Sequence, residues 1–417
     1  MPGIDLKIDL KTLRSILVKT YFTSRSSILI LGAPGLGKSS TVLQVAEIIA
    51  DLLNRKLVVY DDSLEIDPAR DFVFVDIRLT EVEASDLIGV PRTRDGYVAY
   101  MPLKWAKVMA TTPGIIFLDE ITNVQDDTVL AASYKILLDR RVGFVKLYDG
   151  VMVVAAGNRP EESSIARELP APQINRTMVL TLDYDNKMDT VSAWLQYLEK
   201  RIRGMPVWND AELEEYRKVV EIVSEWRKRK QPGKLYAIMS AFLATTKKLV
   251  TREIQSATMQ NFATPRTWEM LYWTLTDEYD RIWKPEEMRA ICYGLLGPSI
   301  GEMFYEWLMR PLPNIVEIIN DPSVLEKMRF DDIIIATALL GIWLRSEIDT
   351  LRANPELASK VDKTIAKIRD LAGNEAIIVM LACLGTEKVT AFRRSLQLVA
   401  ILPTLRKIIK EIGKVMG

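Results

Sequence analysis

The sequence predicts an α/β core followed by an entirely helical region, on three observations. In the first half of the chain, short apolar runs alternate with helix-like segments, which is typical of a parallel sheet between helices. A glycine-rich loop separates the first of these runs from the helix-like segment that follows it. Beyond residue 186 the strand-like runs stop, and helical periodicity continues to the last residues.

The elements of the core follow one another in a simple order. An amphipathic helix is predicted in residues 1–27, with an apolar face made by Leu10, Leu13, Ile16 and Leu17. The runs that predict strands are Ser27–Leu31, Asp71–Leu79, Gly114–Leu118, Val151–Ala156 and Met178–Leu182. A helix is predicted at Ser39–Leu53. We therefore divide the chain into an α/β core at 1–186, a helical domain at 187–300 and a C-terminal helical region at 301–417.

Length and composition agree with this division and exclude several function classes. A chain of 417 residues exceeds the size of one ordinary domain. Lys and Arg number 55, as do Asp and Glu, so no global excess of positive charge favours nucleic acid as a partner. These totals do not exclude a basic patch on one part of the surface. The sequence contains no histidine, which excludes imidazole general bases, His-ligated metals and Ser-His-Asp hydrolases.

The cysteines and the apolar runs predict a cytoplasmic protein without a membrane span. Cys292 and Cys383 lie far apart in apolar, helix-like surroundings, where we expect buried, reduced thiols. The first fifteen residues lack the apolar region of a secretory signal. The longest apolar runs, Ile333–Leu344 and Ala376–Leu384, fall short of the roughly 20 residues that span a bilayer, so we predict buried helices there.

The glycine-rich loop has the spacing of a phosphate-binding loop, Gly-x4-Gly-Lys-Ser, between a strand and a helix. Its glycines let successive backbone N–H groups point at phosphate oxygens, and the helix that follows adds its partial positive charge. Lys38 would bind the β- and γ-phosphates, and the Ser39 hydroxyl would ligate Mg²⁺. The predicted nucleotide-binding residues are Gly32, Ala33, Pro34, Gly35, Leu36, Gly37, Lys38, Ser39 and Ser40.

Two acidic residues and an asparagine follow later predicted strands. Asp119 would hold Mg²⁺, and Glu120 would orient and polarise the attacking water. A strand-end turn also explains an Asp-Glu pair, but its position after a phosphate-binding loop favours catalysis. Asn158 closes the next strand, where it could contact the water or the γ-phosphate, or could be an ordinary turn residue.

Arginines outside the loop are candidates for stabilising the transition state. Arg266 opens a helix after Thr264 and Pro265 and could fold back onto the γ-phosphate, with a solvated helix-start arginine as the alternative. Arg176 precedes the last strand and could reach the site of a neighbouring subunit. Arg140 and Arg141 are its rivals, although interaction with the helix dipole explains them without catalysis.

These motifs, in this order, resemble the MoxR-like branch of the AAA+ ATPases, within the helix-2-insert group that includes dynein-like and chelatase-like proteins. Segments similar to that branch are Ser85–Gly89, Gly114–Thr122, Leu137–Gly143, Ala155–Arg159, Leu169–Arg176 and Ala263–Glu269. Later segments resemble a subgroup often paired with a von Willebrand factor A-type protein; they are Gly294–Pro298, Phe304–Leu308 and Pro311–Ile319. The resemblance extends to about residue 345.

The resemblance implies ATP and Mg²⁺ as cofactors and assigns roles to the residues above. Lys38 and Ser39 would belong to the Walker A motif, and Asp119 and Glu120 to the Walker B motif. The remaining implied roles are sensor 1 for Asn158, sensor 2 for Arg266 on a helical lid at 187–300, and arginine finger for Arg176. Thr177 departs from the family, which usually has Phe after the finger arginine.

Two inserted hairpins are also implied by the resemblance. The helix-2 insert would be Gly89–Met101, and a second hairpin, Arg141–Val151, would turn near Tyr148–Gly150. In rings of this family such loops often face a pore or a client. Tyr97 and Tyr100 could contact a client, and cross-strand packing within the hairpin is the alternative.

Two functions are consistent with these features, and a nucleotide-dependent scaffold that barely hydrolyses ATP is a weaker third. The first is a ring-forming, chaperone-like ATPase, hexameric by resemblance, that remodels or activates a protein partner such as a von Willebrand factor A-type protein. The second is a nucleic-acid motor or loader, such as a helicase, packaging or restriction-type translocase ATPase. The basic segment Arg227–Lys230 could contact phosphate in the second case, but it also fits a solvated helix end.

Overall fold

The computed structural model describes residues 6–184, 188–251, 259–384 and 397–416. Two compact units make up the chain. The first contains residues 1–228 and 250–303, and the second contains residues 229–249 and 304–417. The three-part division made from the sequence stays a prediction, because helices on both sides of residue 187 pack into the first unit.

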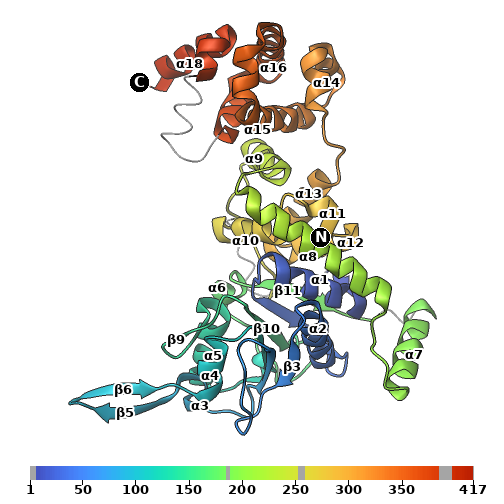
Figure 1. The fold of residues 1–417 in the computed structure, drawn as a ribbon, viewed down its shortest axis with the longest axis vertical. Coiled ribbons are helices and arrows are strands. Elements are labelled where there is room, and N and C mark those ends of the chain that lie inside the picture. The colour runs from blue at the N-terminus through green and yellow to red at the C-terminus, as the bar shows by residue number, and fades with distance from the viewer. Residues whose placement is uncertain (1–5, 185–187, 252–258, 385–396, 417) are drawn as a thin grey trace. The chain divides into compact units, whose positions relative to one another are not determined.

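A seven-stranded parallel sheet forms the centre of the first unit (Figure 1). The strand order is β1-β11-β2-β10-β7-β4-β3. The seven strands are β1 Lys7–Ile8, β2 Ile28–Leu31, β3 Lys56–Val59, β4 Asp71–Arg78, β7 Gly114–Asp119, β10 Val151–Gly157 and β11 Met178–Leu182. The predicted α/β fold with a parallel sheet between helices is therefore confirmed. The sequence did not predict β1, which has two residues, or the edge strand β3, whose ends are exposed.

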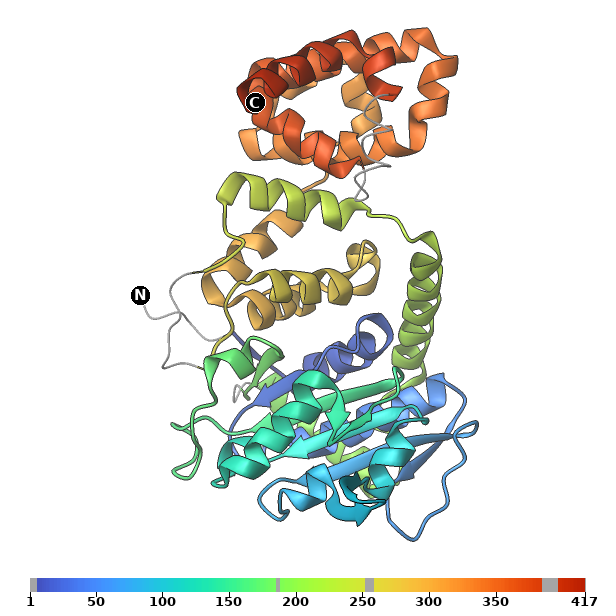
Figure 2. The same ribbon diagram turned by 90° about the vertical axis from the view of Figure 1, so that its left-hand side faces the viewer.

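Helices cover both faces of this sheet (Figure 2). Alternate strand residues such as Leu29, Ile116 and Val153 share one hydrophobic cluster with the helices between β4 and β10. The opposite face packs against α2, which contacts β4, β7 and β10. The helices of the core are α1 Leu10–Thr23, α2 Lys38–Leu52, α3 Ser85–Ile88, α4 Lys104–Met109, the 3-10 turn η1 Ile121–Asn123, α5 Asp127–Asp139 and α6 Ala171–Ile174.

Two hairpins extend from the core. The first, β5 Val90–Arg94 with β6 Tyr97–Met101, lies within the segment predicted for the helix-2 insert. The second pairs β8 Arg141–Val142 with β9 Val145–Lys146. Its turn is at Gly143 and Phe144, so the predicted turn near Tyr148–Gly150 was wrong. Gly143 has a positive φ of 55° and lies against the main chain of Ile88, whereas the Tyr148 N–H donates to the Met109 carbonyl beyond the hairpin.

The helices that follow β11 complete the first unit. They are α7 Met188–Ile202, α8 Asp210–Arg229, α10 Pro265–Leu275, α11 Tyr279–Ile282, α12 Pro285–Leu296 and the first part of α13 Pro298–Leu308, which continues past residue 303. Thr264 caps α10: its hydroxyl accepts from the Thr267 N–H, and the Thr267 hydroxyl accepts from the Thr264 N–H. Pro265 occupies the first position of this helix, where a missing N–H costs nothing.

The second unit is helical throughout its described part. Its elements are α9 Lys234–Thr246, α14 Ile315–Asn320, the 3-10 segment η2 Pro322–Lys327, α15 Phe330–Ala353, α16 Pro355–Cys383 and α18 Pro403–Met416. The long helices α15 and α16 pack against each other, and Gly373 kinks α16 with a φ of 75°. Both cysteines are buried and unpaired, as predicted. None of the helices within the described ranges is long and apolar enough to cross a membrane.

Candidate active site

The glycine-rich loop joins the carboxyl end of β2 to the first residue of α2. Gly35 and Gly37 have φ values of 80° and 86°, in the left-handed region that favours glycine. A Cβ on Gly32 would lie 2.7 Å from the Leu182 carbonyl oxygen, so this position also needs glycine. The Gly32 N–H donates to the Gly157 carbonyl, which fixes the loop to the end of β10. The N–H groups at the start of α2 therefore face the carboxyl edge of the sheet, which suits an anion.

The Lys38 ammonium lies inside this loop. It donates to the carbonyls of Gly32 at 2.6 Å and Ala33 at 3.0 Å, and to Asn158 Oδ1 at 3.0 Å. Burial lowers the pKa of Lys38, and the nearby carboxylates of Asp119 and Glu120 oppose that shift. These contacts place a positive charge where the loop would surround phosphate. Ser40, by contrast, is exposed on the first turn of α2.

Ser39 and Asp119 meet at the same edge, one from α2 and one from the end of β7. The Ser39 hydroxyl donates to Asp119 Oδ2 at 2.8 Å. Mg²⁺ prefers oxygen ligands and is usually held by one or two protein oxygens together with substrate phosphates. The described residues contain no cluster of three or more His, Cys, Asp or Glu, so a metal held wholly by protein is not indicated there. The Ser39–Asp119 pair fits Mg²⁺ that is shared with a nucleotide.

Glu120 has a left-handed backbone, with a φ of 59°. The Thr80 hydroxyl donates to Glu120 Oε2 at 2.8 Å, and Arg78 Nε lies 3.9 Å from Oε1. Both partners come from the end of β4 and the residues after it. They lie close to Glu120 because Arg78 is opposite Asp119 in the register of the sheet. Sequence reasoning missed Thr80. Its position just after a predicted strand of the same sheet was the available signal.

Asn158 follows β10 and is buried, with contacts to Lys38 at the loop and to Thr122 after β7. Its N–H donates to the Thr122 hydroxyl at 2.8 Å, while its Oδ1 accepts from Lys38. A Cβ on Gly157 would lie 2.7 Å from the Thr122 side chain, so the approach of these two segments is close. Asn158 is therefore fixed by its backbone, and its amide oxygen points at Lys38.

Replacing Asn158 with alanine should lower kcat about 10-fold to 100-fold, because Lys38, the group expected to bind phosphate, loses a hydrogen-bond partner. The measurement is steady-state ATP hydrolysis, beside nucleotide affinity and thermal unfolding. Asn158→Asp is the matched control, since it keeps an acceptor for Lys38. An Asn158→Ala protein that hydrolyses ATP at the normal rate would show that this residue is only a turn residue.

Arg176 and Arg266 lie elsewhere, in one cavity of about 530 Å³ in the first unit. Arg176 Nη1 lies 3.9 Å from Asp139 Oδ1, and both side chains are partly exposed. The cavity lining includes no residue of the glycine-rich loop; it consists of Ser24, Arg25, Ser26, Ser27, Leu138, Asp139, Arg140, Asp149, Arg176, Arg266 and Met270.

This cavity is at the amino edge of the sheet, opposite the glycine-rich loop. Met178, two residues after Arg176, pairs with Ile28 at the start of β2, and its N–H donates to the Ser27 carbonyl. The loop begins only at the far end of this four-residue strand, which spans about 13 Å. Within one chain, Arg266 is therefore not placed at the phosphate loop. The structure groups it with Arg176 instead.

The other candidate basic residues make structural contacts. Arg140 has a φ of 52° and donates to the carbonyls of Tyr148 at 3.2 Å and Val151 at 2.6 Å. Arg141 donates to the Phe144 carbonyl. Arg227, in the basic segment, donates to the carbonyls of Phe22 and Thr23 at the end of α1. Arg140 and Arg227 thus donate to main-chain carbonyls of their own chain.

Comparisons with known proteins agree with this geometry. Residues 28–170 match the family model for the ATPase family associated with various cellular activities (AAA). No curated protein matches the chain.

Among solved structures, a candidate ATPase from Cytophaga hutchinsonii is similar at 17% identity and a TM-score of 0.43, covering 73% of this chain and 91% of that one. NtrX from Brucella abortus in complex with ADP is similar at 13% identity and a TM-score of 0.29, covering 81% of this chain and 64% of that one. A second NtrX structure has 12% identity, a TM-score of 0.27 and coverages of 96% and 68%. All three TM-scores are below 0.5, so these likenesses add nothing to the assignment.

The family match spans β2, the glycine-rich loop, the acidic pair and Asn158, which are the elements that meet at the carboxyl edge of the sheet. Residues 28–170 are therefore a domain of the AAA ATPase family, and the chain is an ATP hydrolase.

Proposed function

We propose that this protein is a ring-forming ATPase of the MoxR-like type that couples ATP hydrolysis to the remodelling or activation of a protein partner in the cytoplasm. The proposal rests on the distance, within one chain, between the residues of the phosphate loop and the two arginines Arg176 and Arg266. The hydrolytic residues lie at the carboxyl edge of the sheet, whereas Arg176 and Arg266 share a cavity at the amino edge. The two arginines act on ATP that is bound by a second copy of the chain.

In this proposal each residue at the carboxyl edge has one task. Lys38 binds the β- and γ-phosphates, and its buried ammonium exchanges carbonyl partners for phosphate oxygens. Ser39 and Asp119 would hold Mg²⁺, which, when bound, neutralises charge on the phosphates. Glu120 orients the attacking water and accepts its proton. Asn158 positions Lys38 and the γ-phosphate relative to that water.

The two edges differ in chemistry, which favours a head-to-tail assembly. One edge offers N–H groups and a lysine for phosphate, and the other offers two arginines for the charge that develops during transfer. Joining unlike surfaces in this way gives a heterologous interface, which closes into a ring or grows into a filament. We propose a closed ring of six copies, in line with the family resemblance.

The hairpins supply a surface for the protein partner. Tyr97, Val98 and Met101 on β5–β6 are 57%, 66% and 54% exposed, and Phe144 on the second hairpin is 69% exposed. The rings of Tyr100 and Phe144 lie 5.4 Å apart, so the two hairpins form a continuous apolar surface. We propose that this surface contacts a protein client, with a von Willebrand factor A-type protein as the expected partner.

Replacing Arg176 with alanine should lower kcat about 1,000-fold or more, the effect of removing an arginine that stabilises phosphoryl transfer in trans. ATP affinity should stay unchanged, because the P-loop of the same chain is intact. Arg141→Ala is the matched control, since Arg141 is the rival arginine and donates only to the nearby Phe144 carbonyl among the contacts described. If Arg141→Ala loses turnover and Arg176→Ala retains it, the assignment of the arginine is wrong.

Stimulation of the ATPase separates the partner classes. A protein partner should raise turnover, and this effect should weaken when Tyr97 and Val98 are replaced by serine. DNA or RNA should have no effect, because the charges balance and Arg227 contacts main-chain carbonyls. Stimulation by DNA or RNA with a steep dependence on salt would instead support a nucleic-acid motor.

A further inference from the structure

Asn175, the residue before Arg176, is buried in a network of hydrogen bonds. Its side chain is 6% exposed. The amide donates to Asn261 Oδ1 at 3.0 Å and to the Phe262 carbonyl at 2.7 Å, and Oδ1 accepts from the Thr264 hydroxyl at 2.9 Å. Asn175 therefore connects the segment before β11 to the segment that leads into α10.

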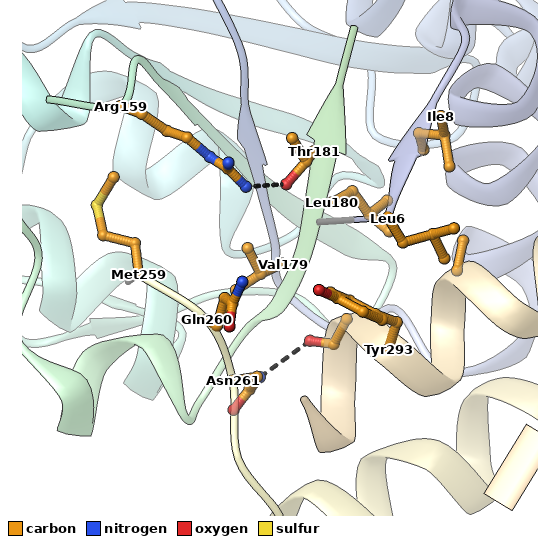
Figure 3. A pocket seen from close by; sticks show the side chains of 12 residues that line it. Leu6, Ile8, Arg159, Val179, Leu180, Thr181, Met259, Gln260, Asn261 and Tyr293 are labelled. Carbon is orange, nitrogen blue, oxygen red and sulfur yellow. Dashed lines mark hydrogen bonds between the residues drawn. The ribbon is translucent and has the colours of Figure 1, made fainter. Parts of the chain in front are cut away.

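Asn261 completes the same network from the other side. Its amide donates to the carbonyls of Thr177 at 2.7 Å and Gly294 at 3.0 Å, and its Oδ1 also accepts from the Phe262 N–H at 3.0 Å. Figure 3 shows its bond to the main chain of α12. Asn261 thus connects Thr177, the residue after Arg176, to α12.

These contacts hold two arginines that lie far apart in the sequence. Arg176 stands between Asn175 and Thr177, and Arg266 stands two residues after Thr264 on the first turn of α10. Among the residues that the structure describes, the side chain of Arg176 makes one loose ion pair, at 3.9 Å from Asp139. The position of each arginine therefore depends on its main chain, which the three polar side chains of Asn175, Asn261 and Thr264 hold. We name these three residues the clasp.

We infer that the clasp is a positioning device that holds Arg176 and Arg266 as one unit for the phosphates of ATP bound to the neighbouring copy. This inference rests on the proposed function. Two guanidinium groups can stabilise one transition state only if their separation is fixed, since a misplacement of about 1 Å costs up to 100-fold in rate. A buried and satisfied network is a rigid way to fix it. Because the clasp joins the segment before β11 to the segment before α10, the distance between Arg176 and Arg266 depends on how α10 packs near β11 within the first unit.

Mixing two inactive chains tests the inference. The first chain carries Glu120→Gln and keeps both arginines. The second carries Arg176→Ala with Arg266→Ala and keeps its P-loop and Glu120. In a mixture, the first chain supplies arginines to the second, so ATP hydrolysis should return. Asn175→Ala is then placed in the first chain or in the second, and thermal unfolding is measured for each variant.

The clasp should matter only in the chain that supplies the arginines. We expect Asn175→Ala in the first chain to lower the restored turnover about tenfold or more, and the same change in the second chain to alter it less than about twofold. An equal loss in both placements, or no loss in either, would overturn the inference, because a merely structural role does not depend on placement. If the parent mixture is inactive, the proposed function fails, and the inference falls with it.

Thr264 provides a second variant within the clasp. Thr264→Val removes the hydroxyl that donates to Asn175 and that also caps α10, whereas Thr264→Ser keeps both contacts. In the first chain, we expect Thr264→Val to reduce the restored turnover and Thr264→Ser to retain it. The opposite order, or equal activity of the two variants, would contradict the clasp.

Discussion

Replacing Glu120 with glutamine should lower kcat for ATP hydrolysis about 100-fold to 10,000-fold, the contribution of a positioned general base. Glutamine has the size of glutamate and can still accept a hydrogen bond from Thr80, which is 2.8 Å from the carboxylate. What it loses is the negative charge that accepts a proton from water. ATP affinity should stay unchanged, because Lys38 and the loop are intact.

The measurement is single-turnover hydrolysis beside direct titration of ATP. Glu81→Gln is the matched control, because Glu81 is an exposed carboxylate close by that pairs with Arg78 at 2.9 Å. We expect its kcat to stay close to that of the unchanged protein. Lys38→Ala should show the complementary defect, with ATP binding itself lost. A Glu120→Gln protein with normal turnover would mean that another group activates the water.

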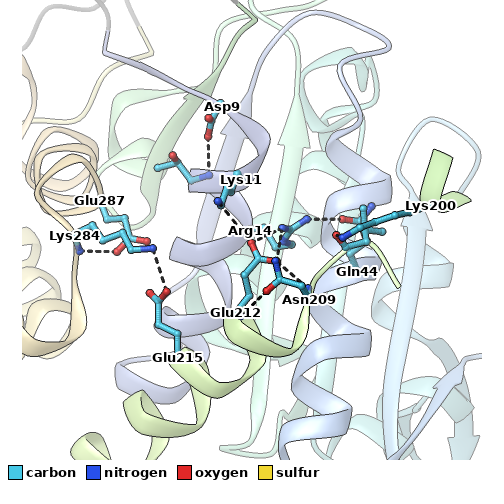
Figure 4. Close-up of polar contacts among 12 residues, drawn as sticks. Asp9, Lys11, Arg14, Gln44, Lys200, Asn209, Glu212, Glu215, Lys284 and Glu287 are labelled. Atoms are coloured by element: carbon cyan, nitrogen blue, oxygen red, sulfur yellow. Dashed lines mark hydrogen bonds and ion pairs between the residues drawn. The ribbon is translucent and has the colours of Figure 1, made fainter. Parts of the chain in front are cut away.

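Replacing Lys19 with methionine should lower the free energy of unfolding by about 3 to 5 kcal/mol, because it leaves a buried carboxylate without its partner. Lys19 on α1 is fully buried, and its ammonium lies 2.8 Å from Glu287 Oε2 on α12 and 3.2 Å from Glu215 Oε1 on α8. Glu287 is also buried, and Lys284 completes the cluster through Glu215 (Figure 4). The cluster therefore ties three helices of the first unit together.

Urea unfolding followed by circular dichroism measures this effect. Lys11→Met on the same helix is the matched control, since Lys11 is 71% exposed and lies 4.0 Å from Glu212. Its free energy of unfolding should change by less than about 1 kcal/mol. Adding Glu287→Gln to Lys19→Met should recover part of the loss, because no buried charge then remains. Equal effects of Lys19→Met and Lys11→Met would show that the buried cluster contributes no more than a surface pair.

The parts of the molecule that depend on local sequence could be predicted. The glycine-rich loop, the acidic pair after β7 and Asn158 after β10 each follow an apolar run, and parallel strands bring their carboxyl ends to one edge. The fold class followed from the same runs. The helices after residue 187 followed from periodicity that reflects one buried face for each helix.

Features set by contacts between distant segments could not be predicted. Arg266 was expected near the γ-phosphate of its own chain, but its place depends on how Asn261 and Thr264 dock against Asn175. The contact of Thr80 with Glu120 needs the register of β4 against β7. The edge strand β3 gives little signal, because its residues are half exposed and it has no apolar alternation. The Thr177 departure from the family is accommodated in full, since its hydroxyl donates to the Ile174 carbonyl in a buried position.

The dependence of ATPase rate on protein concentration tests most directly whether a second copy completes the site. We predict that turnover per chain rises steeply with concentration and then levels off as copies assemble, while Arg176→Ala with Arg266→Ala stays low throughout. ATP binding at low concentration should persist, because each chain carries its own loop. Turnover that does not depend on concentration, and that the double variant retains, would contradict the account.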